Sequence, residues 1–350
     1  MEIGIDSFVA AVPDTITGVN LSPEDRLAHL LEEIKLADEV GLDVFGIGEH
    51  HRAEFLDSAP ETLLAAAAAV TRNIRLTSAV TVLSAHDPVR LFQQFATIDL
   101  LSRSRTEMVV GRGSFIEAFL LFGLQLKDYD ALFAEKLGLL LQLRENERVH
   151  WSGRFRAPLE GQAVYPRPSQ RVFPIWLGVG GTPASFARAG QLGLPLMVAI
   201  IGGQLHRFRP LIDLYRQEAE QAGYPLESLR VGIHALGYVA DTDQQAADEF
   251  FPGYAKSFTE IGKERGWPPV ARSQFEAVRG PAGALLVGDL ERVVERILTC
   301  DQILGGISRL SFQVSIASLP HRMRMHAIEL LGTKVAPLVR SEIQKEVAVR

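Results

Sequence analysis

Residues 174–201, PIWLGVGGTPASFARAGQLGLPLMVAII, pass from the pattern of a strand to that of a helix and back. The apolar run 174–179 predicts a buried strand. Three glycines and a Thr-Pro pair then open a helix over 182–190, and the apolar run 194–201 predicts a second strand. Two strands joined by a helix form a βαβ unit, in which the strands lie parallel in one sheet.

The same alternation extends outward over the whole chain. Apolar runs predict eight strands, at 2–9, 43–48, 74–83, 105–111, 174–179, 194–201, 230–240 and 307–316, with helical patterns between most of them. Eight mostly apolar strands alternating with helices favour a closed (β/α)8 TIM barrel with insertions. A doubly wound sheet is the alternative, but the first strand lacks the dinucleotide fingerprint that usually follows it in that fold.

Several local signals mark where helices begin and end. Ser22 and Pro23 predict a helix start, and Gly41 predicts that helix's end. Ser58 and Glu61 have the spacing of a capping box for the alanine-rich helix that follows. Residues 145–173 predict a hairpin excursion around a Ser-Gly turn, and residues 241–285 predict a lid-like or packed insertion. We expect one domain, residues 1–350.

Composition excludes several classes of protein. The chain is 47% hydrophobic and 22% charged, as expected of a globular protein. Its net charge of −6 argues against a nucleic-acid partner. No apolar run reaches the ~18 residues of a membrane span, and the first residues lack the basic start of a signal peptide. Cys300 is the single cysteine, which excludes a disulfide framework. We expect a cytoplasmic enzyme without a membrane partner.

Two glycine-containing strand ends carry candidate binding residues. The segment GVGGTP, which includes Gly178, Gly180, Gly181 and Thr182, combines close backbone approach with a helix start that favours phosphate. A tight turn without a ligand explains the segment equally well. Arg112, after Gly111, is placed to reach a phosphate or to pair with a nearby acid such as Glu107 or Glu117.

Adjacent histidines follow the second predicted strand, in GEHHRAEF at residues 48–55. A metal site would need His50 and His51 together with Glu54 and perhaps His86, but adjacent residues on an extended segment point to opposite sides. The spacing matches no strong zinc motif, so we expect no metal. The remaining alternatives are that one histidine handles protons or contacts a ligand, or that both hold the loop through Glu49 and Asp57.

Five segments together resemble the bacterial-luciferase-like flavin-dependent monooxygenases: GIGEHHRAEF, RLTSAVTVLSAHDPVRLFQQFATIDLLS, MVVGRGSF, FGLQL and PIWLGVGGTPASFARAGQLGLPLM. They occur in the family's order, and the similarity covers most of residues 1–235. The resemblance implies a single barrel that binds flavin mononucleotide (FMN) at its carboxyl mouth. It implies that Ser78, Ala79 and Val80 lie against the flavin ring, where relatives often have a non-proline cis peptide.

The resemblance also assigns roles to other residues. Arg112 matches the arginine that relatives direct at the phosphate, and Gly178, Gly180, Gly181 and Thr182 match the phosphate loop. Ala199 and Ile200 fall where the luciferase presents backbone to the flavin, and His50 matches its catalytic histidine. Asp130 stands near the position of a second phosphate-binding arginine, and glycines replace an acid and a serine at 180 and 181. Backbone N–H groups, Arg207 or Arg209 would then hold more of the phosphate.

The reaction implied is activation of dioxygen by reduced FMN through a C4a-peroxyflavin that oxidises a small organic substrate. A separate flavin reductase would supply the reduced FMN, and the family often forms homodimers through the helices after strands two and three. A deazaflavin-dependent hydride-transfer enzyme of the same superfamily and a non-catalytic flavin-binding protein are the alternatives. A metal-dependent hydrolase is a more distant one.

Overall fold

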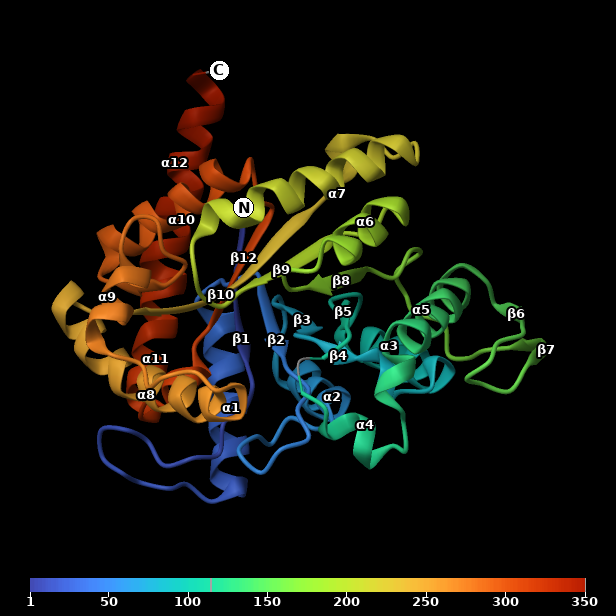
Figure 1. The fold of residues 1–350 in the computed structure, drawn as a ribbon, viewed down its shortest axis with the longest axis horizontal. Helices are drawn as coiled ribbons and strands as arrows, with labels where there is room; N and C mark the ends of the chain where they lie inside the picture. Colours follow the sequence, from blue (N-terminus) through green and yellow to red (C-terminus); the bar gives the residue numbers. More distant parts are fainter. Residues whose placement is uncertain (114, 350) are drawn as a thin grey trace.

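A computed structural model describes residues 1–113 and 115–349 of the chain. Parallel strands alternate with helices around a barrel (Figure 1). The barrel strands are β1 (Glu2–Ser7), β2 (Val44–Ile47), β3 (Arg75–Ser78) with β4 (Thr81–Val82), β5 (Met108–Gly111), β8 (Ile175–Val179), β9 (Leu196–Ile200), β10 (Val231–Val239) and β12 (Arg309–Gln313). Each of the eight predicted strands contains one of these observed strands, except that the predicted strand 74–83 contains both β3 and β4.

The strand order explains how the sheet closes. Neighbours follow the path β3-β2-β1-β12-β10-β9-β8-β5-β4, and each pair along it is parallel. Its two ends, β3 and β4, are consecutive in the chain. Leu76 of β3 also forms a parallel bridge with Thr106, just before β5. The predicted (β/α)8 barrel is therefore confirmed.

A buried ion network fills the amino end of the barrel. Arg309, fully buried at the start of β12, pairs with Glu107 and, at 2.7 Å, with Glu2. Its guanidinium also lies 4.4 Å from the ring centroid of Trp176. The opposite end, the carboxyl mouth, is where (β/α)8 barrels hold their active sites.

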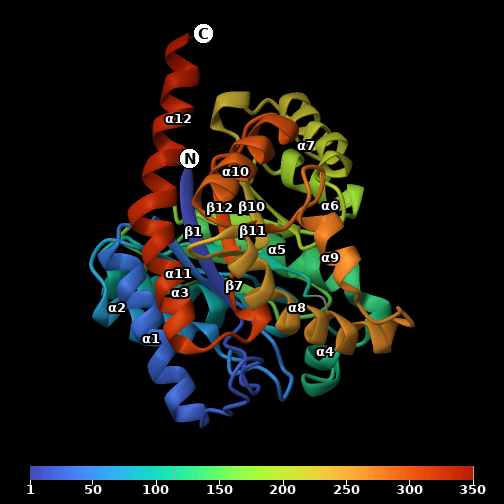
Figure 2. The same ribbon diagram turned by 90° about the vertical axis from the view of Figure 1, so that its left-hand side faces the viewer.

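The outer helices follow the barrel strands. They are α1 (Pro23–Glu39), α2 (Pro60–Val70), α3 (Pro88–Ser102), α4 (Glu117–Leu121), α5 (Tyr129–Glu145), α6 (Pro183–Gln191), α7 (Arg209–Gln221), α10 (Leu290–Leu304), α11 (His321–Leu330) and α12 (Ala336–Val349). Figure 2 shows α12 running along the barrel past the chain's amino end. No helix within the described part of the chain is both long and apolar enough to cross a membrane.

The helix-start predictions were partly right. Ser22 Oγ accepts from the Asp25 N–H, as an N-cap should, and Gly41 adopts a φ of +78° after α1. The capping box of Ser58 and Glu61 was wrong. Helix α2 begins at Pro60, so its N-cap is Ala59, which has no side chain able to cap. Proline at the first helical position shifted the start by one residue.

Two segments leave the barrel repeat. Strands β6 (Arg148–Trp151) and β7 (Leu159–Ala163) pair antiparallel in the predicted hairpin region. Helices α8 (Asp243–Arg265) and α9 (Arg272–Arg279) lie within the predicted insertion, and β11 (Leu286–Gly288) adds to β10. Phe250 and Phe275 between the two helices are fully buried. The segment packs as a helical pair, and its role as a lid stays a prediction.

Candidate active site at the mouth of the barrel

His50 follows β2 and is held by a buried carboxylate. Its Nδ1 lies 2.9 Å from Asp57 Oδ2, and its backbone N–H donates to Asp57 Oδ1 at 3.1 Å. His50 is 9% exposed and Asp57 is fully buried. Burial raises the pKa of Asp57, although the bonds to His50 oppose the rise. An ionised Asp57 can only accept, so the proton then lies on Nδ1 and Nε2 is left to interact with a ligand.

Aromatic rings enclose the His50 imidazole. The ring centroids of Phe8, Phe55 and Phe115 lie 4.5, 4.6 and 5.6 Å from that of His50. These residues come from the segments after β1, β2 and β5, which meet at the mouth. Apolar walls around a titratable ring restrict water and strengthen any electrostatic interaction made there.

His51 belongs to a separate polar cluster centred on Glu49. Glu49 Oε1 lies 3.0 Å from His51 Nε2, while Oε2 lies 3.0 Å from His86 Nε2 and accepts the Val82 N–H at 2.7 Å. Burial favours neutral Glu49, but bonds from His51, His86 and Val82 outweigh it and lower the pKa of the carboxyl. Burial likewise disfavours charged His86, yet Glu49 raises the pKa of His86 overall. This cluster ties the end of β2 to β4.

His50, His51, Glu54 and His86, the residues considered for a metal site, do not converge on a common position. His50 is bonded to Asp57, whereas His51 and His86 contact opposite oxygens of Glu49. Glu54 instead pairs with Arg52. The loop-holding alternative named Glu49 and Asp57 as partners of the histidines, and both contacts are present. Among the described residues, the polar contacts of the His50 ring involve Nδ1 alone, and its proton-handling role stays a prediction.

A second acid–histidine pair lies inside the barrel and was missed from the sequence. Asp6 Oδ2 and His234 Nδ1 are 2.6 Å apart, with Asp6 3% and His234 7% exposed. The Phe8 ring stacks on His234, with centroids 5.7 Å apart. His234 interrupts the apolar pattern of β10, which indicates a buried polar group, but its partner Asp6 depends on how the strands are arranged in the barrel.

The predicted flavin-contacting segment joins β3 to β4. Ala79 and Val80 are linked by a cis peptide bond, as expected from the resemblance. Ser78 Oγ donates to the Val109 carbonyl at 2.9 Å and accepts the Val109 N–H at 3.1 Å, so it ties this segment to β5, and its contact with a flavin stays a prediction. A Cβ on Gly111 or on Gly178 would lie 2.7 Å from a Val80 methyl. Those two glycines are therefore required by close packing against Val80, and their contact with a cofactor stays a prediction.

Arg112 reaches the first turn of α6. Its Nη2 donates to Ser185 Oγ at 3.1 Å, and its Nη1 donates to Asp130. The guanidinium also lies 5.0 Å from the Tyr129 ring centroid. The acids suggested from the sequence as partners were wrong, since Glu107 pairs with Arg309 and Glu117 pairs with Arg52. Arg112 is instead shared between a helix start and the exposed Asp130.

The start of α6 forms an open cradle beside Arg112. A Cβ on Gly180 or Gly181 would meet no atom within 4 Å, and both residues are exposed. Thr182 is the N-cap, but its side chain makes no capping bond. An uncapped helix start, two open glycines and a guanidinium fit a phosphate group. Ser185 was not foreseen, because its approach depends on how β5 packs against β8.

Within the described part of the chain, the remaining residues predicted to contact FMN form no hydrogen bond or ion pair with the Arg112 cradle. Ala199 is half-buried and Ile200 is buried on β9, the neighbour of β8. Arg209 bonds to Asp213 at 2.8 Å and lies against Gly305, away from the cradle. Arg207 is exposed after β9. Ser114, within the quoted segment MVVGRGSF, lies outside the described residues.

Comparison with known proteins agrees with this barrel. Residues 1–305 match the model of the luciferase-like monooxygenases. The chain belongs to that family. One relative is 4-hydroxyprotoasukamycin monooxygenase of Streptomyces nodosus subsp. asukaensis, 26% identical with 91% of each chain covered.

Several solved structures share the fold. Monooxygenase RslO1 from Streptomyces bottropensis has a TM-score of 0.82 and 25% identity, covering 96% of this chain and 99% of its own. The oxygenating constituent of 3,6-diketocamphane monooxygenase from Pseudomonas putida, in complex with FMN, has a TM-score of 0.77 at 20% identity over 96% and 98%. An F420-dependent secondary alcohol dehydrogenase scores 0.74 at 18% identity over 97% and 98%. The fold thus serves both cofactors.

Proposed function

We propose that this chain is a flavin-dependent monooxygenase that uses reduced FMN and dioxygen to oxidise a small organic substrate. The observation that carries the proposal is the meeting of Arg112 with the uncapped start of α6, on the same mouth as His50. A phosphate dianion there would gain the helix dipole, backbone N–H groups and a guanidinium fork. Gly180, Gly181 and Thr182 would form its cradle.

The chain's own residues would position FMN and manage protons. Ala79 and Val80, with Ala199 and Ile200, would line the flavin ring. His50, oriented by Asp57, would exchange a proton at Nε2, and the phenylalanines around it would exclude water. Bound reduced flavin supplies the electrons that activate dioxygen.

The specific rival is hydride transfer by a deazaflavin, because one structural neighbour binds F420. A flavin-binding protein without turnover is the other alternative. Calorimetric titration of the chain with FMN, riboflavin and F420 in parallel separates them. The proposal expects FMN to bind more tightly than riboflavin and F420. Preferential binding of F420 would contradict it, and FMN binding without oxygen-dependent product formation in a substrate screen would favour the non-catalytic alternative.

Partners of the reaction remain predictions. A separate reductase would supply reduced FMN, and the chain would form a homodimer or a higher homo-oligomer in the cytoplasm. Val70 at the end of α2 and Leu100 and Leu101 near the end of α3 are exposed apolar residues, which is compatible with an interface over these two adjacent helices.

A further inference from the structure

A cavity lies at the mouth of the barrel, apart from the Arg112 cradle. It has a volume of about 290 Å³ and lies between residues 10–21, after β1, and residues 315–324, after β12 and at the start of α11. Helix α1 contributes Arg26 and His29 to its wall. We call it the β1–β12 cavity. The Arg112 cradle is built from β5 and β8, so the two sites share no element.

The buried arginines that line the β1–β12 cavity outnumber the carboxylates that pair with them. Arg26 and Arg324, 3% and 7% exposed, both pair with Glu33, at 3.2 and 2.7 Å. Burial would raise the pKa of Glu33, but the two guanidinium groups hold it well below its usual range. One ionised carboxylate therefore faces two guanidinium cations. Arg322, exposed at the rim, adds a third.

The remaining acids nearby are engaged elsewhere. Asp14 lines the cavity but accepts the N–H groups of Ile16 and Thr17, at 3.0 and 2.6 Å, on its own loop. Glu32 lies 2.8 Å from His321 Nε2. Neither carboxylate pairs with Arg322 or Arg324 among the contacts of the described residues.

Arg324 has a buried donor without an acceptor. Its Nε donates to Glu33 and its Nη1 to the Leu319 carbonyl, but its Nη2 is buried and bonds to none of the described residues. A buried cationic N–H without an acceptor is costly, because it has lost its bonds to water and gained none in return. The residue lines the cavity, so a ligand oxygen placed there would satisfy it.

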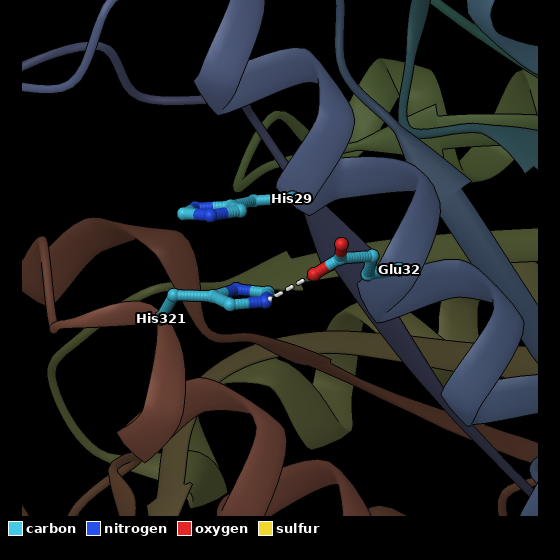
Figure 3. A group of neighbouring side chains, drawn as sticks. All are labelled: His29, Glu32 and His321. Atoms are coloured by element: carbon cyan, nitrogen blue, oxygen red, sulfur yellow. Dashed lines mark hydrogen bonds and ion pairs between the residues drawn. The ribbon is translucent and has the colours of Figure 1, made fainter.

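Two stacked histidines on the cavity wall are poorly arranged to share a metal ion. The His29 and His321 rings lie 3.8 Å apart and 7° from parallel (Figure 3). Imidazole lone pairs lie in the ring plane, so parallel stacked rings cannot both aim at one ion. Glu32, the third possible ligand, is already bonded to His321. His29 Nδ1 is buried and has no hydrogen-bond partner among the described residues, and His29, like Arg324, lines the cavity.

We infer that the β1–β12 cavity binds an oxyanion, the carboxylate or phosphate group of a small molecule. Arg324 Nη2 and Arg322 are its donors, and His29 forms part of its wall. The cavity is about as large as the smaller pockets that hold ligands. Ser315 lines it and accepts the Phe8 N–H at 3.0 Å, and the Phe8 ring packs on His50. Ser315 and Phe8 therefore connect the cavity to the His50 ring.

The test uses the flavin-free full chain and does not depend on its redox chemistry. Calorimetric titrations with sulfate and with succinate distinguish a tetrahedral oxyanion from a carboxylate. We expect one of them to bind, and Arg322→Ala and Arg324→Lys to weaken it by about tenfold or more. Arg324→Lys keeps a positive charge beside Glu33 but removes the second N–H group of the guanidinium, which would bind the anion. Arg171→Ala, an exposed arginine before β8, is the matched control and should leave binding unchanged.

Several outcomes would overturn the inference. Equal affinity in wild type and in Arg322→Ala would show that the anion binds elsewhere, even if Arg324→Lys failed to fold. Binding of neither anion by the folded wild type would also reject it. Stoichiometric zinc binding that is lost in His29→Gln, without anion binding, would identify the cluster in Figure 3 as a metal site instead.

Discussion

Arg112 Nη2 donates to Ser185 Oγ at 3.1 Å, so a cation at the end of β5 lies in the first turn of α6. The guanidinium and the helix start favour an anion at the same place. The two residues are 73 positions apart in the chain, and they meet because β5 and β8 are neighbours in the barrel.

We expect Arg112→Ala to weaken FMN binding by about tenfold or more while changing riboflavin binding little, because only FMN carries the phosphate. Fluorescence titration of both flavins measures the ratio. Arg188→Ala, further along α6 and stacked on Phe133, serves as the control. Equal weakening of FMN and riboflavin would remove Arg112 from the phosphate site.

Asp130 competes with a phosphate for Arg112. Its exposed carboxylate accepts from Arg112 Nη1, so Asp130→Asn should free the guanidinium and remove a like charge near the cradle. We expect FMN to bind about three- to tenfold more tightly, mostly at low salt. Asp213→Asn, which releases Arg209 elsewhere, is the control. Unchanged or weaker FMN binding would mean that the phosphate does not approach Arg112.

His50→Ala should lower turnover by about a hundredfold or more while FMN affinity changes little, since a positioned proton donor or acceptor typically contributes that much. Asp57→Asn should lower turnover too, because it no longer fixes the imidazole. His51→Gln alters the neighbouring histidine, which is bonded to Glu49, and should have a much smaller effect. Wild-type turnover by His50→Ala would reject the catalytic role.

Two glycines of the same loop should respond differently to alanine. A Cβ on Gly178 would lie 2.7 Å from Val80 Cγ1, whereas one on Gly180 would meet nothing within 4 Å. We expect Gly178→Ala to lower the free energy of unfolding by about 1–3 kcal/mol and Gly180→Ala to change it little. Urea denaturation measures both. Equal stability of the two variants would show that the Val80 side chain can move to accommodate the added Cβ.

The Glu49–His86 contact should make stability depend on pH. The folded-state pKa of His86 is raised, so its stabilisation is full below the unfolded value of about 6.5 and is lost as pH rises through the folded value. Glu49, whose pKa is lowered, stays ionised at pH 5.5. The free energy of unfolding of the wild type should therefore exceed that of His86→Gln by more at pH 5.5 than at pH 9. A difference that is equal at both pH values would contradict this.

The barrel could be predicted because its strands are nearly all apolar and its helices carry clear start signals such as Ser22. Strand β11 could not, since three residues offer too little pattern. The approach of Arg112 to the α6 start followed from strand ends and the family resemblance. Ser185, Asp130 and the Asp6–His234 pair depend on which strands become neighbours and on side-chain direction. Local sequence patterns contain neither kind of information.

The most direct test of the proposed function is the reaction of the reduced complex with oxygen. Reduced FMN and the chain would be combined without oxygen and then mixed rapidly with aerated buffer, while absorbance is followed. The proposal predicts a long-lived species whose spectrum differs from those of reduced and oxidised FMN. Reoxidation at the rate of free FMN, or no binding of reduced FMN, would contradict it.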